Sequence, residues 1–562
     1  MCAIARRWSP QPLAGAAPKG KYKEFFICAV RRLRPRQVTA LHPQLSQASL
    51  ANQQLRWQQA EAIARQYLGS SPGDPLAMTI LGEALLGMRR AVDAETALRA
   101  AIATNPHSVP ARLALSRSLD MQCRIDEAVE LLDGVLGEQP DSPEVWEYLA
   151  QLLGRARRFA LAIKAHEQVL RFGAENPRLW LEYAIALRFA GRQPDALRAL
   201  RRALELEPSY GPAWWVMTSM APDAVAPTDL ELIESALKRS GHDQASRFLH
   251  VALATILDRS GDHERAFRHF AAGKALSPAA HDPDRFERYC TDAIERFDTD
   301  FYDQHAGMGA QSAAPVFIVG LPRSGSTLVE RILGGHSQIE AAGELPVVPS
   351  LVEQMEASVE RRSGYRDLLP NLSAARANEL GDLYLRRSGE FRDTASPFFT
   401  DKLHMNWLHL PLIGAILPNA RIIDVRRDAL DCCWSNFKTI FTSGHPAADN
   451  LGHIGRFYRD YARTMDHVAQ ARPGSVLQVR YEKVVDDIEG ETRRILDFLG
   501  LEFEPACLDF HRLASPVATQ SAEQVRKPLN SEGLGRWKPY RQWLGALFQA
   551  LGELAEETSS RP

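Results

Sequence analysis

The first half of the chain is predicted to be helical, because small residues recur along it every 34 positions. Five alanines keep this spacing: Ala60, Ala94, Ala128, Ala162 and Ala196. Between them, apolar residues follow the period of a helix, as in Leu131, Leu132 and Val135. Small residues let two antiparallel helices approach closely. The pattern therefore predicts a right-handed α-solenoid over residues 38–280, followed by a helix and linker over 281–313.

Prolines fall on the same lattice, where each would start a helix after a turn. They are Pro72, Pro106, Pro140 and Pro208. The unit resembles the tetratricopeptide repeat, with a degenerate copy around residues 209–245. Repeats of this kind commonly bind peptides, so we expect a protein or peptide partner; a solenoid that only scaffolds the next domain is the alternative.

The second half alternates short apolar runs with helical patterns, which is typical of an α/β domain. Residues 315–320 (PVFIVG) predict a buried parallel strand, and 421–425 (RIIDV) predict another. We expect a P-loop-like domain with a mostly parallel sheet over residues 314–545, then a C-terminal helix and tail over 546–562. Ligands of such sheets bind outside the carboxyl ends of the strands.

A glycine-bearing loop, residues 321–327 (LPRSGST), follows the first strand and precedes a helix. This arrangement points backbone N–H groups and a helix dipole at a phosphate. A nucleotide kinase loop would need Lys where this chain has Ser326, so phosphoryl transfer from ATP is disfavoured. Arg323 supplies the cation of the loop instead.

The loop, together with Arg427 and Ser435 eight residues apart, resembles the sulfotransferases, in particular the tyrosylprotein sulfotransferases and bacterial proteins that join tetratricopeptide repeats to such a domain. The resemblance implies 3′-phosphoadenosine 5′-phosphosulfate (PAPS) as sulfuryl donor and no metal. It implies that the 5′-phosphosulfate is bound by Pro322, Arg323, Ser324, Gly325, Ser326 and Thr327. It implies that Arg427 and Ser435 bind the 3′-phosphate.

The same resemblance assigns catalytic roles to three residues. Glu344 would be the general base, and Lys402 and Ser521 would stabilise the transition state. It adds nucleotide contacts from Tyr481 and from a segment that covers the cofactor. The residues of that segment are Gln524, Val525, Lys527 and Arg536.

Two departures from the family pattern concern charge and acceptor. A cation expected twelve residues beyond Arg427 is Thr439 here, and the adjacent Lys438 is a candidate replacement. The second Glu of the family's GEE sequence is Leu345.

The expected acceptor is a tyrosine hydroxyl in a protein or peptide, with a carbohydrate or small-molecule hydroxyl as the competitor. A tetratricopeptide scaffold without turnover is the alternative from another class.

Composition limits the partners and the cellular compartment that we expect. The formal net charge of −2 gives no electrostatic reason to expect nucleic acid. The seven cysteines are scattered and form no CxxC, which favours a reducing compartment, and we expect the cytoplasm. No apolar run is long enough for a membrane span. Residues 1–37 read as a basic, disordered tail, with a targeting peptide as the other interpretation.

Overall fold

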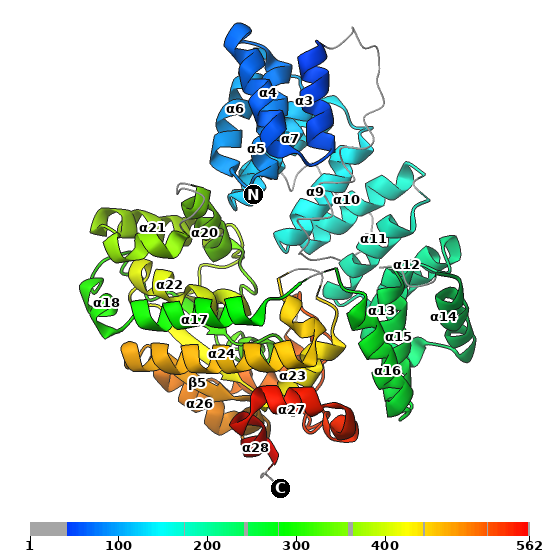
Figure 1. Ribbon diagram of the computed structural model, residues 1–562, viewed down its shortest axis with the longest axis vertical. Coiled ribbons are helices and arrows are strands. Elements are labelled where there is room, and N and C mark those ends of the chain that lie inside the picture. The colour runs from blue at the N-terminus through cyan, green and yellow to red at the C-terminus, as the bar shows by residue number, and fades with distance from the viewer. Residues whose placement is uncertain are drawn as a thin grey trace.

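The computed structural model describes residues 42–559 apart from 174, 241–244, 279, 358–363, 442–443 and 514. The basic tail expected over residues 1–37 lies outside this part of the chain. The solenoid arches along one side of the C-terminal half (Figure 1). Its helices are α3 (Pro43–Gln53), α4 (Trp57–Ser70), α5 (Pro75–Gly87), α6 (Ala91–Thr104), α7 (Val109–Met121), α8 (Ile125–Glu138), α9 (Pro143–Arg155), α10 (Phe159–Arg171), α11 (Pro177–Phe189), α12 (Gln193–Leu206), α13 (Gly211–Met220), η2 (Pro222–Ala224, 3-10), α14 (Pro227–Ser240), α15 (Ser246–Arg259) and α16 (His263–Ala275).

Consecutive helices of the solenoid pair as hairpins, as the 34-residue lattice predicts. The five lattice alanines are completely buried, so their small side chains set the close approach of each pair. Caps fix where helices begin: the Asp74 carboxylate accepts from the N–H groups of Leu76 and Ala77, just before Pro75 at the first position of α5.

One turn in each repeat adopts left-handed backbone, again with a spacing of 34 residues. These turns lie at Leu55, Arg89, Cys123, Arg157 and Gly191. Several of them face the C-terminal half. Arg89 pairs with Glu353, Arg157 donates to the carbonyl oxygen of Ala341 at 3.4 Å, and Gly191 abuts the Arg526 side chain. The repeat period therefore places a row of turns along the second domain.

The C-terminal half contains a five-stranded sheet in the order β2–β3–β1–β4–β5, and all its described pairings are parallel. This confirms the expected fold class. The strands are β1 (Pro315–Val319), β2 (Ile339–Glu340), β3 (Phe398–Asp401), β4 (Arg421–Arg426) and β5 (Val476–Arg480). The helices are α17 (Pro283–Arg296), α18 (Thr299–Gln304), α19 (Ser326–Leu333), α20 (Val347–Ala357), α21 (Ala374–Gly389), α22 (Leu410–Ile416), α23 (Ala429–Lys438), α24 (Leu451–Ala471), α25 (Tyr481–Asp486), α26 (Ile488–Leu499), α27 (Gly545–Leu551) and α28 (Glu553–Ser559). Short 3-10 helices are η3 (Tyr365–Asn371), η4 (His404–His409), η5 (Pro446–Asp449), η6 (Pro505–Arg512) and η7 (Lys538–Trp543).

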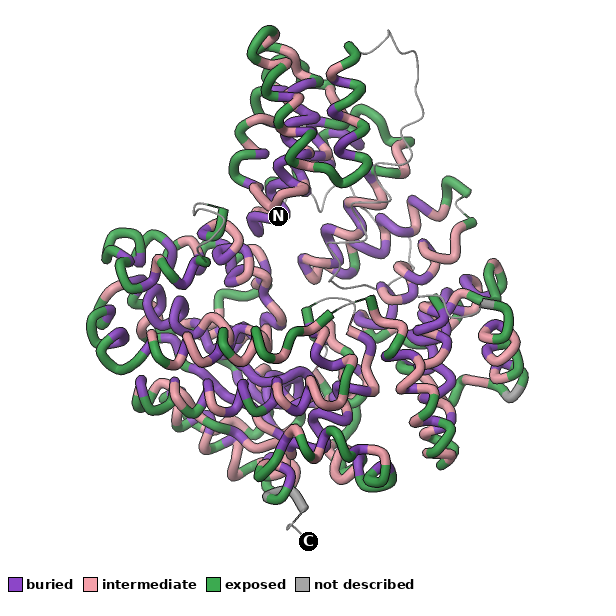
Figure 2. The backbone as a smooth tube through the Cα atoms, viewed as in Figure 1, coloured by how far each residue is buried: buried purple, intermediate pink, exposed green. Residues whose placement is uncertain are grey.

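Strand β1 is buried along its whole length, at the centre of the sheet. Its alternate residues enter two apolar clusters: Phe317 and Val319 share one with the solenoid, whereas Val316 and Ile318 pack with α19 and α26. Figure 2 shows the resulting buried layers running through the sheet and its helices. A strand covered on both faces reads as a continuous apolar run, which is why the sequence pattern located it.

The segment 306–314, expected to be a linker, packs closely against α22. The N–H of Ala310 donates to the carbonyl oxygen of Ile416 at 2.9 Å. A Cβ on Gly309 would lie 2.5 Å from the same carbonyl group. This connection is therefore fixed to the second domain, while the expected domain boundaries stay predictions.

A substitution at the lattice tests the role of its small residues. Ala162→Leu should lower the free energy of unfolding by about 1–3 kcal/mol, because no space exists for the extra methylenes. Ala160→Leu on the exposed face of the same helix should change it by less than about 0.5 kcal/mol. Urea denaturation of the full chain measures both, and equal effects would contradict the close-packing account.

Candidate active site

The loop after β1 passes over the end of β4 and needs glycine to do so. Gly320 has φ +153°, and a Cβ there would lie 2.6 Å from the carbonyl oxygen of Val425. Gly325 has φ +100°, and its Cβ would lie 2.5 Å from the Tyr481 ring. Arg323 between them also has positive φ. The loop is thereby folded tightly, with its backbone facing the site.

Helix α19 starts at Ser326, directly after the loop. The first N–H groups of a helix have no partner within it, and the dipole there favours an anion. The Ser324 hydroxyl is buried and has no hydrogen-bond partner among the described residues. Ser326 and Thr327 are buried beside it, and Thr327 lies 3.4 Å from the Thr519 hydroxyl. The loop thus offers unused donors in a confined place.

Arg323 connects two predicted cofactor residues, Ser435 and Gln524, with Ser521, which was predicted to stabilise the transition state. Its Nε donates to the Ser435 hydroxyl at 3.1 Å, its Nη1 to Ser521 at 2.5 Å, and its Nη2 to Gln524 at 3.4 Å. Ser435 comes from α23 after β4, whereas Ser521 and Gln524 come from residues 515–537, which we call the covering segment. The elements expected to bind the two phosphate groups therefore meet at one point.

Arg427 lies at the carboxyl end of β4, and its guanidinium donates to two main-chain carbonyl oxygens. They belong to Arg323, at 3.2 Å, and to Gly533 of the covering segment. Its Nε is buried without a hydrogen-bond partner among the described residues. The guanidinium also lies 5.2 Å from the centre of the Tyr481 ring.

The two arginines carry little compensating charge. Arg323 has no carboxylate within ion-pair distance in the described part of the chain, and that of Asp431 is 3.9 Å from Arg427. Burial, and then the neighbouring Arg427, lower the pKa of Arg323 to about 10, so Arg323 remains cationic at neutral pH. Two desolvated cations with neutral partners are suited to binding an anion with more than one charged group.

Glu344 and Lys402 form an ion pair beside the loop, at the carboxyl ends of β2 and β3. Their Oε1 and Nζ atoms are 2.7 Å apart. Lys402 is buried, whereas the Glu344 side chain keeps 35% of its surface exposed, so a second molecule can reach it. Burial alone would raise the pKa of the Glu344 carboxyl, but Lys402, together with smaller contributions from His404 and Arg157, outweighs burial and holds that pKa below its usual value. Glu344 is therefore ionised at neutral pH.

The neighbourhood of this pair is held by buried polar contacts. Glu330 of α19 accepts from the N–H of Gly343 at 2.9 Å and from the Thr400 hydroxyl at 3.0 Å, tying the Glu344 loop to β3. Burial lowers the pKa of His404 to about 4, so its imidazole is neutral beside the pair.

Comparison with known proteins agrees with this geometry. Residues 315–505 match the model of the sulfotransferase family, and residues 45–108, 85–152 and 177–219 match tetratricopeptide-repeat models. This chain joins tetratricopeptide repeats to a sulfotransferase domain.

The relatives are distant. An uncharacterized protein of Aquifex aeolicus is 29% identical over 310 residues, which cover 54% of this chain but only 41% of that protein. Protein-tyrosine sulfotransferase 1 of Danio rerio is 24% identical over 238 residues, covering 40% of this chain and 65% of that protein. Among solved structures, the sulfotransferase domain of the Synechococcus PCC 7002 olefin synthase is 20% identical, with a TM-score of 0.34 over 45% of this chain and 97% of that one.

The solenoid contributes to the candidate site, which the sequence did not predict. Arg157 lines a small pocket with Glu344, Lys402 and Thr519. Its guanidinium bridges the carbonyl oxygens of Ala341, at 3.4 Å, and Pro516, at 3.2 Å. The 34-residue period of the repeats predicts that a turn lies near Arg157. It does not predict which surface of the second domain that turn contacts.

The remaining predicted site residues differ in burial and in the groups that they contact. Pro322 is buried, and its carbonyl oxygen accepts from Asn436 at 2.7 Å. Ser521 contacts Arg323, whereas Lys402 contacts Glu344. Val525 is buried in the apolar cluster of α19. Lys527 and Arg536 are exposed, and neither bonds to the loop within the described residues, so their cofactor roles stay predictions.

Lys438, the candidate replacement for the missing cation at Thr439, has a partner in the solenoid. Its ammonium pairs with the half-buried carboxylate of Asp258 on α15 at 2.9 Å. Its service to the cofactor stays a prediction.

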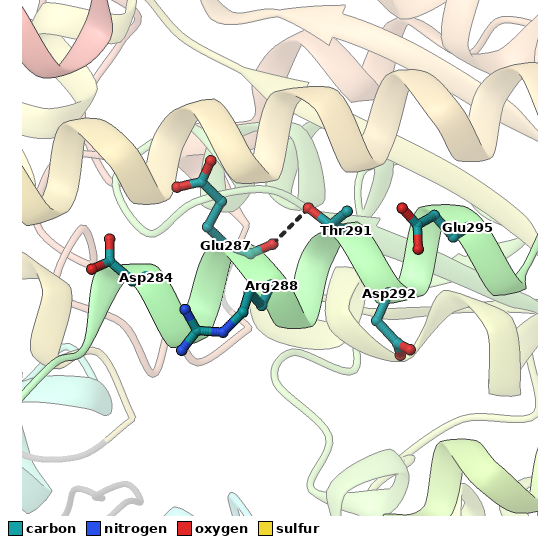
Figure 3. Close-up of a pocket in the computed structure, with 6 residues that line it drawn as sticks. All are labelled: Asp284, Glu287, Arg288, Thr291, Asp292 and Glu295. Carbon is teal, nitrogen blue, oxygen red and sulfur yellow. Dashed lines mark hydrogen bonds between the residues drawn. The ribbon is translucent and has the colours of Figure 1, made fainter.

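A separate open hollow lies on α17, away from the loop (Figure 3). Its wall carries the carboxylates of Asp284, Glu287, Asp292 and Glu295, together with Arg288. Because acidic groups dominate, it is unsuited to a phosphate or sulfate. Over the described residues, no helix has the length and apolar character to cross a bilayer, and no three side chains gather as metal ligands.

The residue before Lys402 makes stability depend on pH. Asp401 accepts from the Tyr384 hydroxyl at 3.0 Å, and burial raises its pKa to about 7. Since the unfolded value is about 3.9, folding favours the protonated Asp401 between these values, and the contribution of Asp401 to stability falls as pH rises through this window. Asp401→Asn should flatten that fall.

Urea denaturation at pH 5 and pH 8 measures the effect. Asp382→Asn, on the exposed side of α21, is the control and should leave the wild-type dependence unchanged. Parallel stability curves for Asp401→Asn and the wild type would contradict the account.

Proposed function

We propose that this protein transfers a sulfuryl group from PAPS to an acceptor hydroxyl, with a tyrosine in a protein or peptide as the favoured acceptor. The observation that carries the proposal is the meeting of Arg323, Arg427 and Ser435 at the carboxyl ends of β1 and β4. Two nearly uncompensated cations beside a helix N-terminus suit a nucleotide with phosphate groups at both ends of its ribose.

The residues present fit such a donor. The buried Ser324 hydroxyl and the Arg427 Nε lack hydrogen-bond partners among the described residues, and Gly325 lets the Tyr481 ring pack directly on the loop backbone. The loop residues 322–327 would hold the 5′-phosphosulfate, and Arg427 with Ser435 the 3′-phosphate. Tyr481 and the covering segment would enclose the nucleoside. When bound, PAPS supplies the sulfuryl group and a bisphosphate leaving group.

Glu344 is proposed as the general base. It is ionised, partly exposed and held in place by Lys402, so it can accept the proton of an approaching hydroxyl. Lys402 and Ser521 would stabilise negative charge on the departing phosphate oxygen, and Ser521 is held by a hydrogen bond from Arg323 of the loop. No residue in this scheme requires a metal.

The relatives and the repeats support a protein acceptor. The relatives named protein-tyrosine sulfotransferases align with about two fifths of the chain, and the repeats give an extended protein surface. A solenoid that carries Arg157 into the site favours an acceptor that is itself part of a protein. Cytoplasmic location remains part of the proposal.

Labelled sulfate transfer tests the function. Incubation of the full chain with sulfate-labelled PAPS and a cell extract should label the protein fraction, with the label on tyrosine. Label in the glycan or lipid fraction would instead identify a carbohydrate or lipid hydroxyl as the acceptor. Turnover of ATP with magnesium and none of PAPS, or no turnover at all, would overturn the proposal.

Glu344→Gln tests the base. Transfer should fall roughly 10²–10⁴-fold, because the amide cannot accept the proton, while binding of 3′-phosphoadenosine 5′-phosphate (PAP) persists. Glu340→Gln is the control, since the Glu340 carboxylate faces Arg392 and Thr394, away from Lys402. Near-full turnover by Glu344→Gln would reject this role.

A further inference from the structure

The covering segment, residues 515–537, has no helix or strand of its own. Its position therefore depends on individual contacts. On the side of the loop, these contacts come from Arg323 to Ser521 and Gln524, and from Arg427 to Gly533. These are the groups proposed to bind the nucleotide, so a bound phosphate would compete for them. Arg331 also donates to Ser515 at the start of the segment. The N–H groups of Gly535 and Trp537 donate to Asp431 at its end. Residues 521–526, between these two attachments, need a further contact.

The solenoid makes a second set of contacts with the same segment. Arg188, in the last turn of α11, forms a two-pronged ion pair with Glu523, with both N···O distances at 2.7 Å. The Arg188 side chain is 3% exposed and that of Glu523 is 22% exposed. Paired, parallel hydrogen bonds of this kind fix orientation as well as distance.

Neighbouring residues strengthen this attachment. Arg526 donates to the carbonyl oxygen of Phe189 at 3.1 Å. The Phe189 side chain is buried in the same apolar cluster as Ala522 and Val525 of the covering segment. The ion pair therefore lies beside an apolar contact between the two domains, with Arg188 buried and Glu523 partly exposed.

Glu523 is also placed unfavourably for an anionic ligand unless its charge is neutralised. It lies between Ser521 and Gln524, both of which bond to Arg323. Arg188 neutralises this carboxylate, and its own positive charge is close enough to act on Arg323. Without Arg188, a bare carboxylate would face the approach of a multiply charged nucleotide.

We propose that Arg188 of the solenoid is a positioning residue for the nucleotide: it holds and neutralises Glu523 and so keeps the covering segment over the phosphate loop. The effect on nucleotide binding rests on the proposed function. The claim that Arg188 holds the covering segment does not depend on it. The solenoid then acts on donor binding and is more than a docking surface for the acceptor.

Four variants of the full chain test the proposal: R188Q, R188K, R188Q/E523Q and the control R89Q. The control breaks another ion pair between the two domains, Arg89 with Glu353, which lies on α20 and not on the covering segment. Hydrogen exchange in the ligand-free protein should speed up in peptides from 515–537 for R188Q and stay unchanged there for R89Q.

Titration of the same variants with PAP measures whether Arg188 affects nucleotide binding. R188Q should weaken PAP binding about tenfold, within the usual range of coupling between sites, with R188K intermediate. R188Q/E523Q should recover part of the loss, because the uncompensated carboxylate is gone. In turnover, KM for PAPS should rise with kcat at saturating PAPS near the wild-type value.

The outcomes separate the two proposals. Unchanged exchange of the covering segment in R188Q, or an equal loss of PAP affinity in R89Q, would overturn the role of Arg188. A wild-type protein that binds no PAP would overturn the proposed function instead, while the exchange experiment would still decide whether Arg188 holds the segment.

Discussion

The parallel pairing of β1 with β4 is the constraint on which the site depends. Its register sets Val319 opposite Asp424, so the chain that leaves each strand emerges at the same edge. Gly320 lets the loop cross directly over Val425, which brings the Arg323 backbone to the Arg427 guanidinium. Any side chain at Gly320 would separate the two cations. This close crossing is what the proposed binding of one nucleotide at both its charged ends depends on.

The 34-residue period is a second constraint, and it acts across the domains. Because each repeat ends its first helix in a left-handed turn, the turns form a row that meets the sulfotransferase domain at regular intervals. Arg157 reaches the pocket of Glu344 and Lys402, and Arg188 lies just before the turn at Gly191. The solenoid thus contributes cations to a site whose reactive groups all come from the other domain.

The sequence was sufficient for the elements and for the groups that lie next to strands. Buried parallel strands read as apolar runs, and loops at their carboxyl ends must converge, so Arg323, Arg427 and Ser435 could be expected to meet. Glu344 and Lys402, assigned by resemblance, do form a pair. The contacts between the two domains could not be predicted. They pair Lys438 with Asp258, and they place Arg157 and Arg188 of the solenoid beside the candidate site. Periodicity fixes each element but contains no information on which surface a turn will face.

Direct measurement of nucleotide binding tests the central claim, that the loop and the Arg427–Ser435 pair bind opposite ends of one nucleotide. Calorimetric titration of the full chain with PAP and with adenosine 5′-phosphate compares ligands that differ only in the 3′-phosphate. The account predicts that PAP binds much more tightly and that Arg427→Gln removes most of this difference. Equal affinities for the two nucleotides, or a difference that survives Arg427→Gln, would contradict it.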